Sequence, residues 1–134
     1  MTSSGKIELM APAGSFESLQ AALDNGADSV YFGVEQLNMR ARSSINFTLD
    51  DLQEISHRCK QKNVRTYLTL NTIIYDHDLS IIKTLLDKAK KADITAVIAM
   101  DQAVIAYARQ IGMEVHISTQ INITNIETVK FYAL

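Results

Sequence analysis

The chain has 134 residues, of which 47% are hydrophobic and 21% are charged, as is usual for one compact soluble domain. A chain of this size can build one hydrophobic core but not two. The formal net charge of −2 gives it no general attraction to nucleic acid. We therefore expect a single domain over residues 1–134.

Two features of the sequence bear on where the protein works. No apolar run approaches the roughly 18 residues of a membrane-spanning helix, and residues 1–6 lack the apolar stretch of a secretory signal. We therefore expect a cytoplasmic protein without a membrane contact. The single cysteine, Cys59, offers neither an internal disulfide nor a cysteine-based metal site, so we expect no metal in this segment.

The first half of the chain alternates between two hydrophobic patterns. Residues 7–10 form a short apolar run closed by an Ala-Pro-Ala-Gly turn, which predicts a strand. Ser15 is the predicted N-cap of the helix that follows, and Gly26 its left-handed end. Residues 29–34 are rich in β-branched and aromatic side chains and predict the second strand.

The same alternation continues beyond a long loop over residues 35–46. Thr48 and Asp51 resemble a capping box, which predicts a second helix with Cys59 on its buried face. Residues 64–70 predict the third strand. The remaining predicted elements are a helix over residues 79–89, a strand over 95–100, a helix capped by Asp101, a strand over 114–119 and a helix capped by Thr124 with Glu127.

This order of elements predicts an α/β fold of parallel βα repeats. No two-residue hairpin turn joins neighbouring strands, so the crossovers must be right-handed helices. The turn after the first strand lacks the glycine pattern of a dinucleotide-binding fold. The last strand alternates polar and apolar residues, as expected where one sheet face lines a barrel interior. We therefore predict the N-terminal half of a TIM-like (β/α)₈ barrel, truncated after strand five, with five βα units and an incomplete last helix.

Five sequence motifs, in order and at the right spacing, resemble those of the collagenase-like peptidases (peptidase family U32). The similarity extends over residues 7–131. The motifs are ELMAPAG at 8–14, NGADSVYFG at 25–33, NMRARSSINFT at 38–48, NT at 71–72 and HISTQINITN at 116–125.

The resemblance implies two different chemistries. Some members of the family are described as proteases that act on collagen-like substrates, and this is the function we expect, with a peptide as the partner. The alternative is oxygen-independent hydroxylation of an RNA base, in tRNA or rRNA, or of a quinone precursor. That reaction uses an iron–sulfur cluster held by cysteines outside this segment. A third interpretation is a structural fragment without activity of its own.

Candidate ligand-binding residues cluster at predicted strand ends. His116, Ser118 and Gln120 share the polar face of the last strand, and Asn122 follows it. Asn71 ends the third strand. Barrel enzymes carry their ligand groups at this end of the strands, and amide side chains offer both a donor and an acceptor. We expect these residues to bind substrate, although interior packing and helix capping also explain them.

Two arginines extend the predicted site. Arg40 and Arg42 lie in the long loop over residues 35–46, and a guanidinium suits the carboxylate of a peptide or the phosphate of RNA. We expect them to bind an anionic part of the substrate, with solvated loop charges as the alternative. No catalytic residue is assigned, because the sequence has no zinc-protease motif and Cys59 is expected to be buried.

Half a barrel also predicts association. The first and fifth strands become sheet edges with unpaired backbone groups. The first strand is apolar and carries no proline within residues 7–10. We therefore expect the chain to self-associate through open sheet edges.

Overall fold

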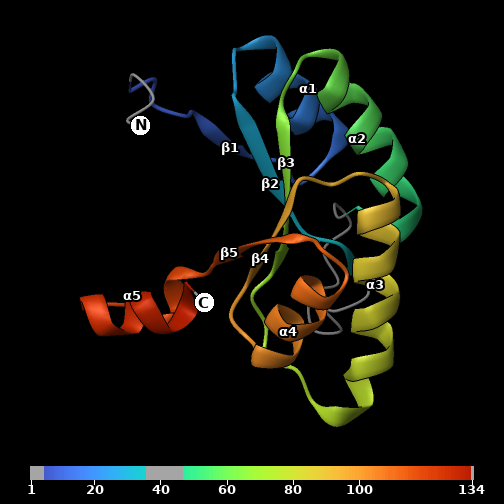
Figure 1. Ribbon diagram of the computed structural model, residues 1–134. Coiled ribbons are helices and arrows are strands. Elements are labelled where there is room, and N and C mark those ends of the chain that lie inside the picture. The colour runs from blue at the N-terminus through green and yellow to red at the C-terminus, as the bar shows by residue number, and fades with distance from the viewer. Residues whose placement is uncertain (1–4, 36–46, 134) are drawn as a thin grey trace.

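The computed structural model describes residues 5–35 and 47–133, and these form a five-stranded sheet backed by helices (Figure 1). All neighbouring strands run parallel, in the order β1-β2-β3-β4-β5. The predicted class, α/β with parallel βα repeats, is therefore confirmed. The strands are β1 (Met10–Pro12), β2 (Ser29–Phe32), β3 (Arg65–Leu70), β4 (Ala96–Ala99) and β5 (Glu114–Ile117).

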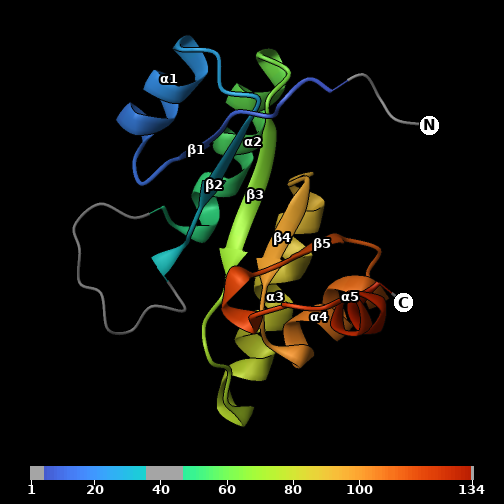
Figure 2. The same ribbon diagram turned by 90° about the vertical axis from the view of Figure 1, so that its left-hand side faces the viewer.

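A helix follows each strand, and helices α2 and α3 lie behind the sheet when it is viewed from its open side (Figure 2). Helix α5 projects away from the other helices. The open face is the one that a complete barrel would turn inward. The helices are α1 (Phe16–Asp24), α2 (Leu52–Gln61), α3 (Leu79–Lys91), α4 (Gln102–Gln110) and α5 (Ile126–Tyr132).

The core lies between the sheet and its helices. Val30 on β2 is fully buried, and so are Leu68 on β3 and Val97 on β4, which pair with each other in the sheet. Leu52 and Leu85 cover them from α2 and α3 and are equally buried. Most strand residues that point towards the helices are thus apolar, as the predicted strand pattern requires. Thr66, on the same face of β3 as Leu68, is a buried polar exception.

Three of the predicted helix starts are confirmed. The Ser15 hydroxyl caps α1, and the Asp101 carboxylate caps α4 by accepting from the Ala103 N–H at 2.8 Å. Thr48 and Asp51 form their capping box around a short 3-10 turn that leads into α2. The predicted end of the first helix is confirmed too, because Gly26 has φ +85°.

The predicted cap of the last helix is wrong by one residue. Asn125, not Thr124, is the N-cap of α5, and its Oδ1 accepts from the Thr128 N–H at 3.0 Å and from the Thr128 hydroxyl. Asparagine is at least as good an N-cap as threonine. Thr124 and Glu127 have the spacing of a capping box, but this spacing does not distinguish Thr124 from the neighbouring Asn125 as the N-cap.

The first strand is displaced from the predicted residues 7–10. Leu9 pairs with the start of β2 through Asp28, whose carboxylate accepts from the Leu9 N–H at 2.8 Å, and regular pairing begins only at Met10. Pro12 therefore lies within the strand, contrary to the prediction. The Ala13 N–H donates to Tyr31 on β2, so the nitrogen of Pro12 faces the free edge, where it has no hydrogen to offer.

This proline makes the β1 edge a poor surface for strand pairing. Self-association stays a prediction, and other surfaces of the chain suit it better. On α5, Ile126, Val129 and Phe131 expose 63%, 45% and 67% of their surface. We expect the 134-residue chain, prepared alone, to associate at micromolar concentration through this helix and the β5 edge. Sedimentation velocity over a dilution series measures this. A 14.9 kDa monomer at every concentration would contradict the expectation.

No helix in the described part of the chain is both long enough and apolar enough to cross a membrane. The prediction of a single domain over residues 1–134 stays a prediction.

Candidate substrate-binding site

The open face of the sheet forms a hollow of about 660 Å³, which we call the inner hollow. Each of the five strands contributes side chains to this hollow, because alternate residues of a strand point to the same face of the sheet. Residues that flank β1, β3 and β5 add further side chains. The lining residues are Glu8, Met10, Tyr31, Tyr67, Thr69, Asn71, Ile98, His116, Ile117, Ser118 and Thr119.

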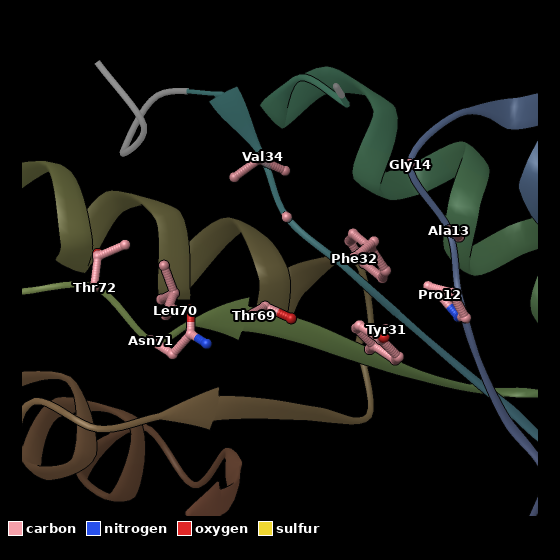
Figure 3. A pocket seen from close by; sticks show the side chains of 11 residues that line it. Pro12, Ala13, Gly14, Tyr31, Phe32, Val34, Thr69, Leu70, Asn71 and Thr72 are labelled. Atoms are coloured by element: carbon pink, nitrogen blue, oxygen red, sulfur yellow. The ribbon is translucent and has the colours of Figure 1, made fainter. Parts of the chain in front are cut away.

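A second hollow of about 320 Å³, the mouth hollow, lies at the C-terminal ends of β1, β2 and β3 (Figure 3). This is the end of the strands at which barrel enzymes bind their substrates. Tyr31, Thr69 and Asn71 line both hollows, so the two adjoin at the wall that these side chains form. The other lining residues are Pro12, Ala13, Gly14, Phe32, Gly33, Val34, Leu70 and Thr72.

A charged network lies at the end of the inner hollow that is nearer the N-terminal ends of β1 and β3. The hydroxyl of Tyr67 donates to Glu8 Oε1 at 2.7 Å, and the Arg65 guanidinium pairs with the other carboxylate oxygen. The hydroxyls of Ser29 and Tyr67, together with the Arg65 charge, hold the pKa of Glu8 below its usual range. Burial and the bond to Glu8 raise the pKa of Tyr67 to about 12, so Tyr67 stays a neutral donor.

His116 lies beside this network. Its Nε2 is 2.6 Å from Glu114 Oε1, and its ring meets that of Tyr67 edge to face with centroids 4.7 Å apart. A carboxylate on one ring nitrogen fixes the orientation of an imidazole. The remaining nitrogen can then accept or donate a proton, as general acid–base chemistry requires.

The structure brings three of the predicted binding residues together. Asn71 follows the last paired residue of β3, and Ser118 follows that of β5, while His116 lies two residues before Ser118. All three line the inner hollow. Their role in binding substrate stays a prediction. Arg40 and Arg42 lie outside the described residues, so their predicted role also stays open.

Two other predicted residues do not reach the hollows. The polar alternation of the last strand was expected to continue to Gln120, but β5 ends at Ile117 and the chain turns into a 3-10 helix over Thr119–Ile121. Ser118 starts this turn by accepting from the Gln120 N–H. Gln120 and Asn122 are exposed. Asn122 has φ +56° and ends the 3-10 helix in the left-handed conformation. Neither lines the inner or the mouth hollow.

Sequence reasoning missed Glu8, Arg65 and Tyr67. The carboxylate of Glu8 lay inside an apolar run that was taken as a buried strand. A charged residue within such a run needs a partner when it is buried, and this signal pointed to an ion pair. Its partners lie 57 and 59 residues further along the chain, so no local pattern identifies them.

Thr69 carries an unusual polar atom at the wall between the two hollows. Its Oγ1 is buried and has no hydrogen-bond partner among the described residues. A buried hydroxyl without a partner costs about 1–3 kcal/mol. Such groups are uncommon in native proteins and call for an explanation. A position in the wall of a binding site explains this one, because a bound ligand could supply the missing hydrogen-bond partner.

Cys59 is buried in α2, 1% exposed, and burial raises the pKa of its thiol to about 11. Because the thiolate is the reactive form, we expect the native thiol to react with a disulfide reagent at pH 8 at least ~100-fold more slowly than it does after unfolding in guanidinium. A rate measured by absorbance in both states tests this. Equal rates would show an accessible thiol and reopen its assignment to the core.

No metal site is formed in the part of the chain that the structure describes, since no three His, Cys, Asp or Glu side chains come close enough to share an ion. An iron–sulfur cluster also does not fit these residues, because its usual ligands are thiolates and the one cysteine of the chain is buried. Any such cluster needs ligands from beyond this segment.

The sheet order, the helices on one face and the hollow at the strand ends are those of a (β/α)₈ barrel half. Peptidase family U32 matches residues 14–134, and the chain belongs to this family. A solved structure, the U32 peptidase Mk0906, has a TM-score of 0.70 at 11% identity. It covers 99% of this chain, which spans 57% of that structure's length. This likeness supports the barrel fold.

The curated relatives carry names from two chemistries. A protein named collagenase from Porphyromonas gingivalis is 56% identical over 94% of this chain. The tRNA hydroxylation protein P1 of Bacillus subtilis is 30% identical over 95%. The chain spans only 30% of the length of either relative.

Proposed function

We propose that the complete protein is a peptidase and that this chain supplies the peptide-binding part of its barrel. The observation that carries the proposal is the mouth hollow. Its described lining offers the Asn71 amide, apolar rings and the hydroxyl-bearing side chains of Tyr31, Thr69 and Thr72, but no charged side chain. A peptide group presents one donor and one acceptor to such a surface. The similarity to the protein named collagenase supports the same substrate class.

Three side chains have distinct roles in this proposal. Asn71 holds a peptide group of the substrate at the mouth. Ser118 helps to shape the opposite wall of the inner hollow. His116, oriented by Glu114, can move a proton to or from a bound group. Other residues of the catalytic machinery would lie beyond this segment, because the chain spans 30% of its relatives' length.

Hydroxylation of an RNA base remains a second candidate, and the similarity to tRNA hydroxylation protein P1 favours it. An amide side chain also recognises the edge of a base. The iron–sulfur chemistry of that reaction would need cysteine ligands outside this chain, and the residues here would only bind and orient the base.

The two candidates are separated by one comparison on the complete protein. We expect release of fluorescence from quenched gelatin and short peptides, and no mass increase of 16 Da in unmodified tRNA. The variant Asn71→Ala, purified in the same way, controls for contaminating host proteases because its activity should fall. Hydroxylated tRNA without peptide cleavage would replace the peptidase proposal by the second candidate.

A further inference from the structure

Two glycines line the mouth hollow although the described structure gives no reason for glycine at either position. Gly14 precedes the N-cap of α1, and Gly33 follows β2. Neither has φ in the left-handed region, and a Cβ added at either would meet no atom of the described residues within 4 Å. Both are exposed and both line the hollow.

Two of the other glycines serve the backbone. Gly26 and Gly112 have φ +85° and +70°, which side chains rarely tolerate. Gly5 also has open space at its Cβ position, but it lies before β1 and lines neither hollow. Gly14 and Gly33 are therefore distinguished by their place at the hollow.

A glycine that the fold does not require permits the close approach of something else to the backbone. We propose that Gly14 and Gly33 form a subsite in which an uncharged peptide group of an extended substrate lies directly against the backbone, with its edge towards Asn71. This inference rests on the proposed peptidase function and assigns the part of the substrate that the hollow takes.

The described part of the lining favours a peptide over a nucleic acid. A nucleotide brings a phosphate, and most nucleic-acid affinity comes from cations that neutralise it. No described residue that lines the mouth hollow carries a charge. Pro12 and Tyr31 instead offer exposed rings in the same lining as the two glycines. Extended and polyproline-II peptides dock on such ring-lined grooves.

The test adds single methyl groups to the subsite in the complete protein. For Gly33→Ala and Gly14→Ala we expect the KM for a peptide substrate to rise about tenfold, since one misplaced methyl in a fitted pocket changes discrimination by roughly 10–200-fold. We expect kcat to change less than KM, and Gly33→Val to raise KM further. Gly5→Ala is the matched control and should behave as the parent protein does. The Tm of all four variants should match that of the parent.

Binding of the tripeptide acetyl-Gly-Pro-Ala-amide, measured by saturation-transfer NMR, separates this inference from the proposed function. If the parent protein cleaves no peptide but binds this tripeptide, and Gly33→Val does not, the function fails and the subsite stands. If peptides are cleaved and the glycine variants leave KM unchanged, the subsite is wrong. A fall in Tm of Gly33→Ala would mean that the protein's own chain fills the hollow, which also overturns the inference. So would displacement of the tripeptide by an RNA oligonucleotide at equal concentration.

Discussion

Replacing Asn71 by alanine in the complete protein is expected to lower kcat/KM for a peptide substrate by about 10–100-fold. Asn71 lies where both hollows meet, at the end of β3. A bound peptide group that loses its partner there is left desolvated and unpaired, which costs about 1–3 kcal/mol. Steady-state kinetics on the purified variant measure the effect.

Two further variants show whether the loss comes from the amide itself. Asn71→Asp keeps the shape but replaces the donor with a charged acceptor, so its kcat/KM should be as low as that of the alanine variant. Gln110→Ala removes an exposed amide at the end of α4 that lines neither hollow, and should change nothing. Parent-like kinetics for both Asn71 variants would remove Asn71 from the site.

Replacing Tyr67 by phenylalanine is expected to lower the free energy of unfolding by about 1–2 kcal/mol, because a hydrogen bond to a charged group is lost inside the barrel. The Tyr67 residue is 3% exposed, and its hydroxyl donates to Glu8. Denaturant unfolding monitored by circular dichroism measures the difference. Tyr31→Phe is the matched control, because no hydrogen bond of the Tyr31 hydroxyl is found among the described residues, and it should be close to neutral.

The effect of Tyr67→Phe should depend on pH in a defined direction. The folded pKa of Glu8 lies below its ordinary value of 4.5, with the hydroxyls of Ser29 and Tyr67 as main causes. A lowered carboxyl pKa contributes stability above the unfolded pKa, and this contribution is lost as the pH falls through the folded value. The difference between parent and variant should therefore be full at pH 7 and shrink below pH 4.5. A difference that stays constant down to pH 3 would exclude Glu8 as its origin.

The fold could be predicted from local patterns, because short sequence segments determine each strand and helix of a parallel βα repeat. Each apolar run and each capping residue such as Asp101 acts within a few positions, so the sequence predicts the element order directly. Boundaries were less accurate where a distant partner decides them. The start of β1 depends on Asp28, which binds the backbone of Leu9 from 19 residues away.

The site followed from the sequence only in part, for the same physical reason. Asn71 and Ser118 were predicted because the carboxyl ends of parallel strands meet at one edge of the sheet. Gln120 did not join them, since its predicted place assumed that the strand continues past Ile117. The network of Glu8 and Tyr67 joins residues from distant strands, and only their assembly in the sheet reveals it.

A crystal structure of the complete protein with a bound, non-cleavable peptide tests the proposed peptide-binding role of this barrel half most directly. We predict density for an extended peptide in the mouth hollow, with a backbone group within about 3 Å of the Asn71 amide and the chain lying against Gly33. Peptide bound elsewhere on the protein, with the mouth hollow filled by the protein's own side chains, would contradict the account.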